Sequence, residues 1–163
     1  MGAALVLALS GCGSSEESPV GGETGQQRPS IEVVEVEYTA MMERVQDALT
    51  TEYGVGPWSQ HGREPVTGFL CDEVEGGSGI ALNLGSAGPI SDQDWPAALK
   101  AVQDIVGEHG FTELDTVIDE PGDHLVRLAK SDGGYVDFGT QLATALSLLT
   151  GCHPTESSSA PAS

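Results

Sequence analysis

The chain has 163 residues, with 25 Asp and Glu against 6 Lys and Arg, and a formal net charge of -19. So acidic a chain is a poor partner for nucleic acid or for anionic lipid headgroups, because both present phosphates that bind Lys and Arg. The acidity favours solubility, and the attraction of cationic ligands or divalent ions is the alternative interpretation.

The first eleven residues form a short apolar run that ends in small side chains. The run closes on the motif Leu-Ser-Gly-Cys at Cys12, which resembles the lipobox of bacterial prolipoproteins, where the cysteine thiol receives a diacylglyceryl group. A run of this length is too short to cross a bilayer, which needs roughly 20 residues. Since no Lys or Arg precedes it, we expect residues 1–11 to be a truncated signal peptide whose true start lies upstream. The motif predicts lipidation of Cys12 and a location on the extracytoplasmic face of the cell membrane.

Two segments have a composition that does not support a packed core. Residues 12–30 and 154–163 consist mostly of Gly, Ser, Pro, Thr, Glu and Gln. Such segments bury too little apolar surface to offset the entropy lost when the backbone is ordered. We therefore expect a disordered tether and a disordered tail around one folded domain, residues 31–153.

The cysteine count favours a disulfide within this domain. With Cys12 lipidated, Cys71 and Cys152 are left as a pair outside the reducing cytosol. A catalytic or metal-binding thiol is the alternative, but Asp72 and Glu73 beside Cys71 would raise rather than lower its pKa. The sequence thus predicts a Cys71–Cys152 disulfide.

Two amphipathic helices can be read from apolar residues spaced three and four apart. The first carries Met41 or Met42, Val45, Leu49 and Tyr53 and stops at Gly54. The second begins at Ser91, which can cap it together with Asp94, and stops at Gly110. Its apolar face has the following residues: Trp95, Ala98, Leu99, Val102, Ile105, Val106 and His109.

Alternating apolar and polar residues, separated by glycine-rich turns, predict the strands. The expected strands are 66–70, 80–84, 111–119, 124–129, 135–138 and 142–148. In the last segment, a short helix would also bring Leu142, Ala145, Leu146 and Leu149 together, but we favour a strand. The predicted class is α+β: an antiparallel meander of about five or six strands with both helices packed on one face.

This arrangement resembles the actinobacterial LppA-like lipoproteins over about residues 40–153. The similarity rests on the following segments: the lipobox at Cys12, the helix before Pro57-Trp58, Gly68-Phe69-Leu70-Cys71, Asp94-Trp95 to Gly110-Phe111, the Gly133–Phe138 stretch and Thr150-Gly151-Cys152. The resemblance implies an exported, lipid-anchored α+β domain whose two domain cysteines are joined. It implies no activity, because members of this family are largely of unknown function.

Few residues suggest chemistry. The histidines lack the spacing of a zinc site and no nucleophile elbow is present, so we predict no catalytic residue, metal or cofactor. Acidic pairs such as Asp92 with Asp94 could bind calcium or act as acid and base, but they are more typical of solvated turns. Trp58 and His61, in a polar stretch, are the candidate contacts for a ligand or partner, and packing is the alternative for Trp58.

The functional prediction is a lipid-anchored, non-enzymatic envelope protein that binds a small ligand or another envelope protein. The alternative is a cell-wall hydrolase that uses a carboxylate pair, which requires two acids facing one cleft.

Overall fold

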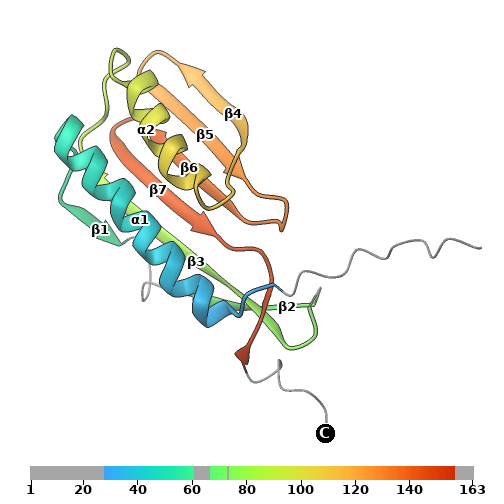
Figure 1. Cartoon of the computed structure of the whole chain (residues 1–163). Helices are drawn as coiled ribbons and strands as arrows, with labels where there is room; N and C mark the ends of the chain where they lie inside the picture. Colours follow the sequence, from blue (N-terminus) through green and yellow to red (C-terminus); the bar gives the residue numbers. More distant parts are fainter. Residues whose placement is uncertain (1–27, 61–66, 73, 157–163) are drawn as a thin grey trace, which may run out of the picture.

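The structure is a computed structural model that describes residues 28–60, 67–72 and 74–156. Cys12, the predicted signal peptide, most of the predicted tether and His61 lie outside the described residues. The described part has two helices and one antiparallel sheet of eight strands (Figure 1). The predicted α+β class is confirmed, with more strands than the expected five or six.

The elements follow the chain in this order: α1 (Ile31–Tyr53), β1 (Trp58–Gln60), β2 (Thr67–Cys71), β3 (Gly77–Ala87), α2 (Trp95–Gly107), β4 (Glu113–Glu120), β5 (Asp123–Ala129), β6 (Tyr135–Thr140), β7 (Ala143–Leu149) and β8 (His153–Pro154). Across the sheet the order is β1-β3-β7-β6-β5-β4, and β2 and β8 also pair with β3. The expected meander is therefore right for β4 to β7 only. β3 lies beside β7 because α2 carries the chain from β3 to the opposite edge of the sheet.

The two helices form as their apolar spacing predicts, with corrected ends. α1 buries Met41, Met42, Val45 and Leu49, and it stops where Gly54 takes a left-handed conformation with φ 69°. The sequence predicts that the second helix starts at Ser91, but α2 starts at Trp95, with Asp94 at the N-cap position. The hydroxyl of Ser91 accepts a hydrogen bond from the backbone N–H of Asp94 at 3.2 Å in the turn before the helix.

The second helix is shorter than expected. α2 ends at Gly107 rather than at Gly110. The backbone N–H of His109 bonds to the carbonyl of Val106 and that of Gly110 to the carbonyl of Gly107, which closes the chain into tight turns after the helix. Gly110 does have the positive φ predicted for it, 89°, but in this turn.

One core lies between the helices and the sheet. Alternate residues of the central strands face the helices and are buried, including Val126, Val136, Phe138, Leu146 and Leu148. Their summed apolar area is the main source of stability for such a two-layer domain.

The last predicted strand is correct from Ala143 onward. Thr144 pairs with Thr140 and is buried, as are the inward-facing leucines that follow it. Leu142 is instead 87% exposed, because it lies in the turn between β6 and β7 and has no place on the inner face.

The two domain cysteines form the predicted disulfide. Cys71 ends β2, Cys152 precedes β8, and their Cα atoms are 5.8 Å apart. Gly77 at the start of β3 pairs with Cys71 on one side and with Pro154 on the other. The disulfide therefore joins the two short strands that flank the beginning of β3.

The ends of the described domain lie together at this corner. The guanidinium of Arg28 donates a hydrogen bond to the carbonyl of Cys152 at 2.8 Å. The carboxylate of Glu32 accepts one from the backbone N–H of Glu156 at 3.2 Å. The first and last segments that the structure describes are thus joined by hydrogen bonds.

Candidate functional site

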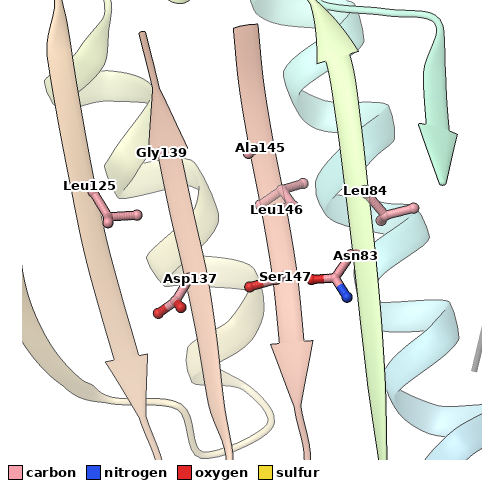
Figure 2. Close-up of a pocket in the computed structure, with 8 residues that line it drawn as sticks. All are labelled: Asn83, Leu84, Leu125, Asp137, Gly139, Ala145, Leu146 and Ser147. Carbon is pink, nitrogen blue, oxygen red and sulfur yellow. The ribbon is translucent and has the colours of Figure 1, made fainter. Parts of the chain in front are cut away.

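Both helices cover the same face of the sheet, and the opposite face has no covering layer in the described part (Figure 1). We call this the bare face. It contains an open depression of about 300 Å³. The lining residues, drawn in Figure 2 with the helices behind the sheet, are Asn83, Leu84, Leu125, Asp137, Gly139, Ala145, Leu146 and Ser147.

The register of four neighbouring strands builds the depression. Leu125 lies opposite Gly139, Gly139 opposite Ala145, and Ala145 opposite Gly85. We call these four residues the small row, since three of them are Gly or Ala. The Gly and Ala residues of the small row occupy little volume above the sheet, so the surface is hollow at this level.

A second line of residues runs beside the small row. It consists of Arg127, Asp137, Ser147 and Asn83, each opposite the next on the neighbouring strand. We call it the polar row. Because strand residues two apart point to the same face, the small row and the polar row open on the same side (Figure 2).

Gly139 is required by the close approach of its neighbours. A Cβ atom built on Gly139 would lie 2.9 Å from the carbonyl oxygen of His124 and 3.0 Å from Cδ1 of Leu125. Leu125 therefore lies over Gly139 and provides an apolar wall. A larger residue at position 139 would displace this wall.

The polar row is electrically balanced. The Nε and Nη2 of Arg127 donate hydrogen bonds to the two carboxylate oxygens of Asp137 at 2.7 and 2.8 Å. The guanidinium carbon also lies 3.7 Å from the ring centroid of Tyr135. These hydrogen bonds to Asp137 raise the pKa of Arg127 above its usual value. The only carboxylate in the depression is thus neutralised by a fixed cation.

The remaining polar side chains of the depression are available to a ligand. Within the described part, neither the amide of Asn83 nor the hydroxyl of Ser147 makes a hydrogen bond to another residue. Together they offer donors and acceptors next to the wall of Leu125. The lining has no histidine, cysteine or lysine, and the carboxylate pair that the hydrolase alternative requires is not found in this depression.

Trp58 lies away from the depression. Its side chain is half-buried and packs against the core. Its indole Nε1–H donates a hydrogen bond to Oγ1 of Thr50 on α1 at 3.0 Å. Its strand partner Ser86 is buried toward the helices. These contacts agree with the packing alternative for Trp58, and His61 lies outside the described residues.

The sequence does not predict a cluster that the structure forms around His124. The ring nitrogens of buried His124 lie 3.0 Å from a carboxylate oxygen of Asp92 and 3.0 Å from one of Asp119. The pKa of Asp92 is lowered mainly by the hydrogen bond from the backbone N–H of Gly122, and further by the hydrogen bond with the His124 side chain. The side chain of Asp92 is still 54% exposed, as expected for a solvated turn. Because both ring nitrogens are engaged and Asp92 also bonds to Gly122, the cluster holds the β4–β5 turn to the segment just before α2.

Two other features of the described residues bear on function. No group of three or more His, Cys, Asp or Glu side chains there is placed to hold a metal ion. No described helix combines the length and apolar character needed to span a membrane.

A second, shallower depression of about 510 Å³ lies on the exposed side of α1, between Val33, Val36 and three glutamates. The following residues line it: Glu32, Val33, Val36, Glu37 and Glu156. It consists of one helix side and the end of the described chain, whereas the bare-face depression is fixed by the register of the sheet. We therefore place the candidate site on the bare face.

The model of the LppA family, described as a lipoprotein confined to pathogenic Mycobacterium, matches residues 14–156. The chain belongs to the LppA family. This confirms the resemblance seen in the sequence and places the chain among lipoproteins, which are associated with the cell envelope.

Two solved structures share the fold of this LppA family member. The crystal structure of LppA from Mycobacterium tuberculosis matches with a TM-score of 0.64 and 14% identity, over 82% of this chain and 84% of that one. A DUF4853 family protein from Actinomyces odontolyticus matches with a TM-score of 0.55 and 18% identity, over 79% and 71%. Among curated proteins, none matches. At these identities the similarity establishes the fold alone.

Proposed function

We propose that this chain is an exported lipoprotein, anchored through Cys12 on the extracytoplasmic face of the membrane, and that its bare face binds a small, uncharged, polar molecule without catalysing a reaction. The observation that carries the binding proposal is the depression between the small row and the polar row. Its volume of about 300 Å³ is at the lower end of the range for small-molecule sites.

The charge of the depression supports an uncharged ligand. In a chain with net charge -19, Asp137 is the single acid of this lining, and Arg127 neutralises it. A cation would find no free carboxylate there, and an anion no free base. Asn83 and Ser147 supply hydrogen bonds of both kinds, and Leu125 supplies apolar contact.

The binding proposal is tested by filling the depression. We expect Ala145→Phe to abolish binding, because Ala145 is exposed and lines the hollow. Ala143→Phe is the matched control: Ala143 is also exposed, on the same face of β7, but outside the lining. The probes are glucose, N-acetylglucosamine and an uncharged dialanine amide, added to the ¹⁵N-labelled full chain and followed by amide chemical shifts.

The expected result is a shift of the Gly139, Ala145 and Ser147 amides with at least one probe, retained in Ala143→Phe and lost in Ala145→Phe. Shifts that the two variants retain equally, or no shift with any of the probes, would contradict the proposal. The anchor has its own test: mass spectrometry of the membrane-purified protein should find Cys12 as a lipid-modified N-terminus, and Cys12→Ala should leave the protein in the soluble fraction. An unmodified Cys12 would overturn the anchoring.

A further inference from the structure

β4 is an edge strand with one unpaired side. In the described part it pairs with β5 alone, and it forms the outer end of the sheet (Figure 1). The backbone N–H and C=O groups on its free side are therefore open to another strand. Two apolar side chains on it are also exposed, Leu114 by 45% and Val117 by 52%.

The exposure of Leu114 follows from the position of the helices. Leu114 is opposite buried Leu128 of β5, so it is on the side of the sheet that the helices cover. It stays exposed because the helix layer does not reach this edge. A strand added beside β4 would cover it.

The free edge carries a strong negative charge. Four of its eight residues are acidic, Glu113, Asp115, Asp119 and Glu120, and none is basic. The side chains of Glu113 and Glu120 form no ion pair within the described residues. Asp115 is opposite Arg127, whose guanidinium is already bound to Asp137.

This charge decides which strand can join. A second copy of β4 would bring four more acids to the first four, and like charges on paired strands are destabilising. A strand with Lys or Arg at the facing positions replaces each of these repulsions with an attraction. The acidic residues thus oppose self-association while they favour a basic partner.

We propose that the free edge of β4 is a docking site for an extended, basic segment of another protein, which pairs with β4 and extends the sheet by one strand. The regular part of the edge, Glu113–Thr116, is the place of pairing, because the ladder with β5 shifts register between Thr116 and Ile118. Lys or Arg of the segment meets Glu113 and Asp115, and an apolar residue covers Leu114. This site is separate from the bare-face depression, and neither proposal depends on the other.

The test uses an eight-residue probe peptide, Lys-Thr-Lys-Val-Lys-Thr-Lys-Val, and the full chain at low salt. In one control peptide, Glu replaces each Lys. In the other, alternate backbone nitrogens carry methyl groups, which removes their hydrogen-bond donors. The chain variant is Glu113→Lys with Asp115→Lys, at the two acids that the proposal pairs with the basic segment. Its matched control is Glu43→Lys with Asp47→Lys, which makes the same charge change on the exposed face of α1.

We expect the Lys peptide to bind and to protect β4 amides from hydrogen exchange. The β4 variant should bind it about ten-fold more weakly, and the α1 control variant should bind it nearly as well as the parent. Neither control peptide should bind. Equal loss in both chain variants, equal binding of the N-methylated peptide, or pairing of the chain with itself through β4 would overturn the proposal.

Discussion

The indole of Trp95 stacks on the imidazole of His124, with ring centroids 4.9 Å apart and ring planes 9° apart. Trp95 is the first residue of α2, and His124 is on β5. Phe138 of the neighbouring strand β6 also stacks on the indole, with centroids 4.7 Å apart. Trp95 therefore fixes the beginning of α2 over two adjacent strands.

Replacing Trp95 should destabilise the domain strongly. Trp95→Ala leaves a cavity between α2 and the sheet, and large-to-small substitutions of a buried aromatic residue cost about 3–5 kcal/mol. Urea unfolding followed by circular dichroism measures this change. Leu142→Ala, at an exposed turn, should stay within about 0.5 kcal/mol of the parent. A similar effect of both substitutions would contradict the position assigned to Trp95.

Trp58 should behave as a packing residue. Trp58→Ala removes a half-buried ring and its hydrogen bond to Thr50, so we expect a loss of about 2 kcal/mol. Thr50→Val, which removes the acceptor but keeps the ring, should cost less. The melting temperatures of the two variants test this order. A melting temperature unchanged by Trp58→Ala would favour a binding role instead.

His153 should make stability depend on pH. Its Nδ1–H donates a hydrogen bond to the carbonyl of Pro29 at 3.1 Å, while its buried Nε2 has no hydrogen-bond partner among the described residues and lies 4.0 Å from a carboxylate oxygen of Asp132. Burial lowers the pKa of His153 below its usual value near 6.5. The unfolded chain therefore binds a proton more readily than the folded one, so the contribution is complete above pH 6.5 and is lost as the pH falls through the folded pKa.

This pH effect can be isolated with His153→Gln. The parent should lose more unfolding free energy between pH 7.5 and pH 5.5 than the variant does, as measured by urea titration at each pH. Because the comparison is between two chains with the same carboxylates, the titration of other groups cancels. An identical pH slope in both proteins would show that His153 is not the source.

The disulfide should stabilise the domain through the unfolded chain. Its cysteines are 81 residues apart, and closing a loop of this length is worth at most about 4–5 kcal/mol. Cys71→Ser with Cys152→Ser should lower the melting temperature, and dithiothreitol should lower that of the parent alone. If dithiothreitol had the same effect on both proteins, the reductant would be acting elsewhere.

Sequence patterns predict a helix or strand correctly where the apolar spacing lies within that one element. The apolar spacing of α1 and α2 and the alternation in β5 and β7 come from residues close together in the chain. β1 and β8 have only three and two residues, too few for any period to be visible. The end of α2 was placed too late because Gly110 belongs to the turn that follows the helix.

The candidate site depends on relationships that no local pattern contains. The depression requires Leu125, Gly139 and Ala145 to share one level of the sheet, which is set by the pairing of three strands. A glycine and an alanine in separate strands give no signal of a hollow by themselves. The His124 cluster likewise joins Asp92 and Asp119, which lie on opposite sides of α2 in the sequence. Such contacts follow from topology, and topology was only partly predicted.

The hydrogen bond between Arg28 and the carbonyl of Cys152 has a mechanical consequence. A tether that joins the domain before Arg28 would transmit any pull from the envelope to a corner where α1 begins and the disulfide closes. The Arg28 hydrogen bond would pass part of that pull to the segment that the disulfide joins to β2. Both proposed binding surfaces lie outside this corner, because the disulfide joins β2 and β8 at the beginning of β3, and β4 is at the far end of the strand order.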